Sequence, residues 1–91
     1  MERKKDRIAT ALKYNPNEQV APKVIAKGVG YVADAILSKG EANDIPIYKD
    51  EKLSQQLYNL SVGEEIPEEL YELVAEVLIF IAKLDGQRQN K

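Results

Sequence analysis

The stretch IATALKY, residues 8–14, decides that this chain is not purely helical, because its side chains alternate with a period of two. The larger side chains, which share one face of the pattern, are Ile8, Thr10, Leu12 and Tyr14. The other face carries the small residues Ala9 and Ala11, which indicates close packing against a neighbour. Residues 15–17, Asn-Pro-Asn, are typical of a turn. The pattern therefore predicts a β-strand over residues 8–14.

A helix is predicted for residues 22–40. Apolar residues recur there at helical spacing, Pro22 suits a first turn and Gly40 suits a C-cap. Gly28 and Gly30 each cost about 1 kcal/mol relative to alanine inside a helix, so they indicate close packing or a local irregularity. The next apolar segment, Ile-Pro-Ile-Tyr at residues 45–48, is predicted to form a short edge strand.

Two further helices are predicted in the second half of the chain. Asp50 is a suitable N-cap for a short helix that ends near residues 61–63. The apolar face of this helix consists of Leu53, Leu57 and Leu60. The last helix is the clearest, with Pro67 in its first turn and an apolar stripe that runs to Leu84. It is predicted to end at residues 85–86, Asp-Gly.

These elements together predict one compact α/β domain, in which a small mixed β-sheet is surrounded by about three helices. The 91 residues leave room for a single modest hydrophobic core. The domain is predicted to span residues 8–85. It is flanked by a basic N-terminal arm at residues 1–7 and a polar tail at residues 86–91.

The composition argues against catalysis and against a bound cofactor or metal. Cysteine and histidine are both absent, which removes thiol nucleophiles, the commonest general base and the commonest zinc ligands. Glutamates gather around the last predicted helix, namely Glu64, Glu65, Glu68, Glu69, Glu72 and Glu76. Spacings of three and four residues are typical of a solvated helix face. A hydrolase that uses a pair of these carboxylates is the weaker alternative.

The charge pattern gives little support for nucleic-acid binding, because the formal net charge is −2 and both signs are interspersed. Basic residues gather only at the start, namely Arg3, Lys4, Lys5 and Arg7. We interpret them as a solvated arm, with acidic lipid or an acidic partner as the alternative contact. The longest strongly apolar run, residues 77–82, is too short to cross a membrane, and no signal peptide precedes it. We therefore expect a cytoplasmic protein without direct membrane insertion.

Two short motifs have the composition of a ligand-binding or reactive site. Residues 28–33 fit the dinucleotide pattern G-x-G-x-x-A, but they fall inside the predicted helix instead of at a strand-to-helix turn, so helix packing is the preferred explanation. The pair Asn15-Pro16 has the composition of a self-cleaving bond, yet no histidine accompanies it and Asn17-Glu18 follows. We interpret this pair as part of a turn.

Several stretches in order resemble one known family. They are Ala-Leu-Lys-Tyr at residues 11–14, Ala-Pro-Lys-Val-Ile-Ala-Lys-Gly at 21–28, Gly-Glu-Glu-Ile-Pro-Glu-Glu-Leu-Tyr at 63–71 and Val-Ala-Glu-Val-Leu at 74–78. Residues 45–48 and 57–58 fall at matching distances between them. The chain resembles the cytoplasmic tail domain of the FlhB/YscU family, the switch proteins of flagellar and type III export. The resemblance covers residues 8–84.

The resemblance also implies a departure. Family members cut themselves within an Asn-Pro-Thr-His loop that lies just before the strand matching residues 8–14. Here Lys4-Lys5-Asp6-Arg7 occupies the matching positions, so self-cleavage there is not expected. The chain begins close to where the C-terminal fragment of the family begins after the cut. We therefore expect a stand-alone FlhB-like protein that occupies, assists or competes for the place of that fragment.

Two partner-binding surfaces are predicted. The first follows from the resemblance, because the family strand just upstream of the cut pairs with the strand that matches residues 8–14, and this chain is expected to lack that upstream strand. Along the resulting open edge, Ile8, Thr10 and Leu12 would accept a strand from a membrane-bound partner or from a second copy, unless the edge is covered. The second follows from the resemblance, which implies a docking patch for export substrates. Its residues are Ala21, Pro22, Ala75 and Leu78. The alternative for Ala75 and Leu78 is a plain core role.

The resulting functional prediction is a non-enzymatic interaction module that acts in export or in substrate-specificity switching. Its expected partners are a membrane-embedded FlhB-type protein, other export-gate components and export substrates. Its expected location is the cytoplasm, including the inner face of the membrane through the export apparatus. A cytosolic regulator that uses the same fold outside the export gate remains the alternative.

Overall fold

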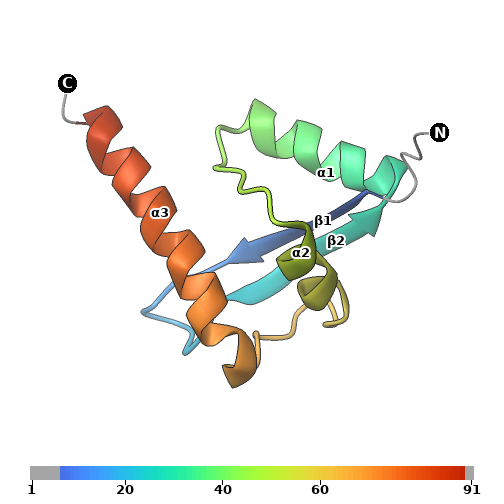
Figure 1. Ribbon diagram of the computed structural model, residues 1–91, viewed down its shortest axis with the longest axis horizontal. Coiled ribbons are helices and arrows are strands. Elements are labelled where there is room, and N and C mark those ends of the chain that lie inside the picture. The colour runs from blue at the N-terminus through green and yellow to red at the C-terminus, as the bar shows by residue number, and fades with distance from the viewer. Residues whose placement is uncertain (1–6, 90–91) are drawn as a thin grey trace.

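The computed structural model describes the backbone of residues 7–89 and the side chains of residues 7–83. Its elements are β1 (Ile8–Lys13), β2 (Lys23–Val29), α1 (Tyr31–Ala42), α2 (Glu51–Tyr58), the short 3-10 helix η2 (Glu68–Leu70) and α3 (Tyr71–Gln89) (Figure 1). The predicted α/β class and the three helices are confirmed. The described sheet consists of two strands, β1 and β2, which run antiparallel.

The strand predicted over residues 8–14 is confirmed as β1, which ends one residue earlier, at Lys13. Its register with β2 runs from the pair Ile8 and Val29 to the pair Lys13 and Lys23, with an irregularity between Ala11 and Leu12. Because Ala11 faces Ala26 whereas Leu12 faces Val24, β2 contains one extra residue and forms a β-bulge.

The single helix predicted for residues 22–40 is wrong in its first half. Lys23–Val29 is strand β2, and the helix begins only at Tyr31. Gly30, with a φ of 65°, makes the turn between them, in a backbone region that residues with a Cβ rarely adopt. Pairing with β1 therefore overrode the helical spacing of the apolar residues, and Gly30 fixed the boundary.

The edge strand predicted for residues 45–48 is also wrong. This segment is an irregular connection between α1 and α2 and pairs with no described strand. Pro46 has no N–H to donate to a sheet. The two described strands are formed by residues 8–13 and 23–29. The Tyr48 ring instead makes a T-shaped contact with the Phe80 ring on α3, with 5.5 Å between the ring centroids.

The predictions for the last two helices are mostly confirmed. Asp50 caps α2, because its Oδ1 accepts a hydrogen bond from the Leu53 N–H at 3.1 Å. Pro67 precedes the single 3-10 turn that leads into α3. However, α3 continues past the predicted stop at residues 85–86 and ends at Gln89, so much of the predicted polar tail is helical.

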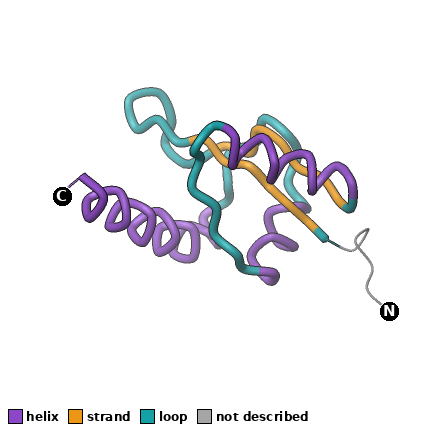
Figure 2. The backbone as a smooth tube through the Cα atoms, turned by 90° about the horizontal axis from the view of Figure 1, so that it is seen from above, coloured by secondary structure: helices purple, strands orange, loops and turns teal. Residues whose placement is uncertain are grey.

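The sheet is covered on both faces. Ala9 and Gly28 lie opposite each other in the register and share one face, which α1 covers so closely that Gly28 has no room for a Cβ beside Val32. Lys27, the next residue along β2, points to the opposite face and reaches α2. Figures 1 and 2 show α1 and α2 on different sides of the strand pair. The domain thus has three layers.

The main hydrophobic core lies between α2, the start of α3 and the sheet. Its buried members are Ala21, Leu53, Leu57, Ile66, Leu70 and Val74, with Leu12, Leu60, Val77 and Leu78 packed against them. Ala9 and Ala33 are buried in the thinner layer under α1. The small face predicted for the first strand therefore does pack closely against a neighbour.

We expect Lys27→Met to lower the free energy of unfolding by about 1–3 kcal/mol. The Lys27 Nζ donates to the carbonyls of Tyr58 and Leu60 at 3.0 and 2.8 Å and lies 4.7 Å from the Tyr58 ring centroid, so it satisfies the C-terminal end of α2. Denaturant unfolding measures the effect. Lys52→Met, on the exposed face of α2, is the matched control and should change stability by no more than about 0.5 kcal/mol. Equal losses in the two variants would contradict this role.

Candidate functional site

Main-chain hydrogen bonds tie residues 61–66 to the start of β2. Gly63, with a φ of 96°, makes the turn in which the Glu64 N–H donates to the Ser61 carbonyl at 3.0 Å. From that turn the Gly63 N–H donates to the Val24 carbonyl at 2.7 Å, and the Val24 N–H donates to the Glu64 carbonyl at 2.9 Å. The Ile66 N–H donates to the Pro22 carbonyl at 2.9 Å and completes the connection. This connection places the start of α3 beside residues 21 and 22.

The loop between β1 and β2 is held closed by Gln19. Its Nε2 donates to the carbonyls of Lys13 and Ala21 at 3.3 and 3.1 Å, and its Oε1 accepts from the Asn15 N–H at 3.1 Å. The side-chain oxygen of Asn15 accepts from the Asn17 N–H at 3.0 Å. Asn15 therefore forms the turn that its sequence context predicted, and the loop presents Tyr14 and Val20 next to residue 21.

A shallow apolar groove of about 200 Å³ results where this loop faces α3. The four residues of the predicted docking patch all line it, namely Ala21, Pro22, Ala75 and Leu78. They come from two segments more than fifty residues apart in the sequence. Ala75 is exposed and Leu78 half-buried, so Ala75 is not the plain core residue of the alternative interpretation.

Five further residues line the groove and were not predicted: Tyr14, Val20, Ile66, Tyr71 and Val74. Tyr71 carried a detectable signal, because it lies four residues before Ala75 and seven before Leu78 and so shares their helix face. Val20, whose side chain is 81% exposed, had no such signal in the sequence. Only the fold of the loop brings it to the rim of the groove.

The second predicted surface, the edge of β1, has unpaired backbone groups. The Arg7 carbonyl accepts from the Gly30 N–H, and in an antiparallel ladder the bonded pairs alternate along the strand. The N–H and C=O groups of Ile8, Thr10 and Leu12 therefore point away from β2, and within residues 7–89 no backbone hydrogen bond reaches them. The buried Thr10 hydroxyl also has no partner among these residues. An added strand would find a free ladder edge here.

The described end of the predicted basic arm is engaged with α1. Arg7 Nη1 lies 2.9 Å from Asp34 Oδ1, which makes an exposed ion pair. Arg3, Lys4 and Lys5 lie outside the described residues.

The dinucleotide-like motif at residues 28–33 does lie at a strand-to-helix turn, contrary to the sequence-based argument against it. Its surroundings still oppose phosphate binding. The Gly30 N–H is taken by the Arg7 carbonyl, and the first turn of α1 carries the carboxylate of Asp34. Anions are favoured at a helix N-terminus only where free N–H groups meet no negative charge. Close packing of Gly28 against Val32 accounts for the first glycine.

The six glutamates around the last helix are all exposed, as a solvated face requires. Within the described part of the chain, no three Asp or Glu side chains converge into a possible metal site. Nor does any helix of that part combine the length and apolarity needed to cross a bilayer.

A family model described as the FlhB HrpN YscU SpaS family matches residues 6–81. The chain belongs to this family. Among its relatives, protein YlqH of Bacillus subtilis is 45% identical over 85 residues, which cover 93% of this chain and 91% of YlqH. The flagellar biosynthetic protein FlhB of Aquifex aeolicus is 41% identical over 75 residues, 81% of this chain.

The FlhB-family fold is also seen in solved structures. The cytoplasmic domain of FlhB from Shewanella putrefaciens matches with a TM-score of 0.87 and 32% identity, over 91% of this chain and 69% of that one. The chain spans only about a fifth of the curated FlhB proteins, since the match covers 21% of the Aquifex relative. The solved FlhB structure that it matches is a cytoplasmic domain.

Proposed function

We propose that this FlhB-family chain is a non-enzymatic interaction domain of the flagellar or type III export apparatus and acts in export or in substrate-specificity switching. The observation that carries the proposal is the groove in which Ala21 and Pro22 meet Ala75 and Leu78. Its lining is apolar and shallow, which suits a short apolar segment of another protein better than a small polar substrate.

The free edge of β1 provides the link to the apparatus. A membrane-embedded FlhB-type protein or another export-gate component would add a strand along Ile8, Thr10 and Leu12 and so hold this domain at the inner face of the membrane. The main-chain bonds of such a strand supply affinity, and the alternate side chains supply specificity. The groove would then remain open to export substrates, because Ala75 and Val20 lie on other elements.

The second candidate function is a cytosolic regulator that uses the same groove away from the export gate. The ion pair between Arg7 and Asp34 supports this alternative, because it engages the described end of the basic arm with the domain itself. Such a regulator would bind export substrates but no membrane-embedded partner. The two functions can therefore be distinguished by one measurement, the association with a membrane-embedded FlhB-type protein.

Co-purification with a membrane-embedded FlhB-type protein truncated at its Asn-Pro bond tests the proposal. The unaltered chain should be retained, and Leu12→Pro should reduce retention at least about tenfold, because proline removes the N–H that the added strand needs. Leu12→Ala is the matched control. It loses the same side chain but keeps the N–H, and should still bind. Failure of the unaltered chain to associate would leave the cytosolic regulator as the function.

A further inference from the structure

One wall of the groove, α3, carries acidic residues beside the apolar lining. Along α3, Glu72 and Glu76 lie one position after the lining residues Tyr71 and Ala75, and both side chains are exposed. Neither carboxylate forms an ion pair with another described residue.

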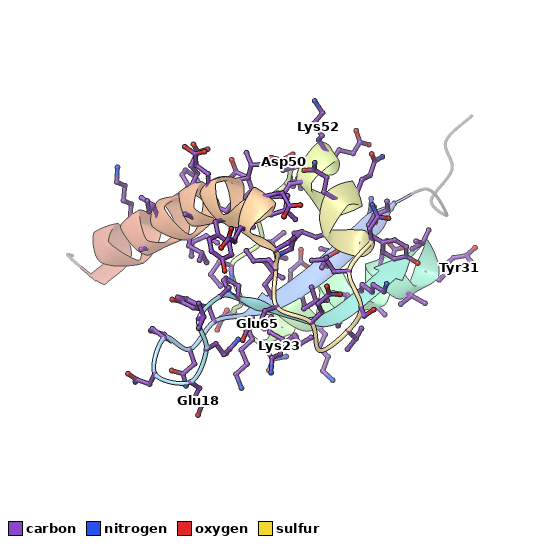
Figure 3. All side chains as sticks on the ribbon, turned by 90° about the horizontal axis from the view of Figure 1, so that it is seen from below. Glu18, Lys23, Tyr31, Asp50, Lys52 and Glu65 are labelled. Atoms are coloured by element: carbon purple, nitrogen blue, oxygen red, sulfur yellow. The ribbon has the colours of Figure 1, made fainter. Side chains whose placement is uncertain are left out.

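Basic residues adjoin the other wall, since Lys13 precedes the lining residue Tyr14 and Lys23 follows Pro22. Lys13 and Lys23 lie opposite each other in the sheet and share the face away from the core. Figure 3 shows Lys23 on the side of the sheet opposite α3. The next basic residue along α3 is Lys83, roughly 10 Å beyond Glu76 at 1.5 Å per residue. A segment that lies along α3 therefore meets carboxylates but no cation before Lys83.

We infer that the groove takes an apolar segment that carries lysine or arginine on one flank; this rests on the proposed docking function of the same groove. Glu72 and Glu76 are four residues apart, so their carboxylates repeat at about 6 Å along α3. Two basic residues one helical turn apart, or two residues apart in an extended chain, have a matching spacing. The acidic flank selects partners and orients them, while the apolar lining contributes most of the contact.

The test uses three fluorescein-labelled peptides that share the same amphipathic sequence and the same leucines. They differ only at two flank positions one helical turn apart, which hold lysine, glutamine or glutamate. Fluorescence anisotropy with the full chain at low salt should give the lysine peptide roughly three- to tenfold tighter binding than the glutamine peptide. The glutamate peptide should bind more weakly than both. High salt should remove most of the difference.

The double variant Glu72→Lys plus Glu76→Lys should reverse the order of the three peptides. Glu51→Lys plus Lys52→Glu, on the exposed face of α2, is the matched control and should preserve the order. Equal affinity for the lysine and glutamine peptides would overturn the inference about charge while leaving groove docking intact. If Ala75→Asp fails to weaken the glutamine peptide, docking in the groove itself is wrong, and the inference falls with it.

Discussion

Replacing Gly28 by alanine should destabilise the domain by about 3 kcal/mol, at the upper end of the usual cost of overpacking. A Cβ at this position would lie 2.7 Å from the Cβ and 3.1 Å from the backbone carbonyl carbon of Val32. The first turn of α1 would therefore have to move, since the clash involves main chain as well as a side chain. Thermal or urea unfolding followed by circular dichroism measures the loss.

Gly40→Ala is the matched control for this experiment. Gly40 lies within α1, and an added Cβ would meet only Ile47 and Ile45, at 3.9 and 4.0 Å, which are ordinary contact distances. Because alanine is the better helix former, this substitution should stabilise the domain by about 0.5–1 kcal/mol. The close approach of α1 to the sheet would be refuted if both glycine variants unfolded at the same denaturant concentration.

Val24→Asp should cost about 3–5 kcal/mol, a large share of the 5–15 kcal/mol that typically separates folded from unfolded domains. The Val24 side chain is fully buried, with 0% exposure, so the introduced carboxylate would lose its hydration. Because burial raises the pKa of this carboxyl group in the folded protein, the loss should shrink as the pH falls from neutral toward about 4, where the unfolded chain is also protonated.

The neighbouring substitution Ile25→Asp separates burial from strand propensity. Ile25 is 48% exposed at the bulge, so a carboxylate there keeps its hydration and should cost no more than about 1 kcal/mol. Both variants place aspartate in the same strand. Urea titrations at neutral pH and at pH 4 compare them. Similar midpoints for the two variants at neutral pH would show that Val24 is not part of the core.

The sequence predicted the elements whose formation depends on local patterns. The alternation in residues 8–13, the Asp50 cap and the apolar stripe after Pro67 are all local signals, and each corresponds to an observed element. The helix prediction for residues 22–40 failed because the spacing of their apolar residues fits both a helix and a strand. Only the long-range pairing with β1 decides that Lys23–Val29 is a strand, and that pairing is invisible in the local pattern.

The site was predictable to a different extent. Ala21, Pro22, Ala75 and Leu78 were found through family resemblance, and the structure brings all four together. Val20 and Tyr14 could not be found, because their place at the groove depends on the loop that Gln19 closes. The open edge of β1 was expected from the family resemblance, because the family strand that pairs there lies upstream of the cut, whereas the strand-to-helix turn at residues 28–33 was not expected.

The hydrogen bonds between residues 63–66 and residues 22–24 have a consequence for how this protein changes over time. The two walls of the groove are aligned by main-chain atoms, which every residue other than proline supplies. Substitutions at Val20, Tyr71 or Ala75 therefore alter what the groove recognises without altering where its walls stand. Recognition can diverge between lineages, or be redesigned in the laboratory, on an architecture that stays constant.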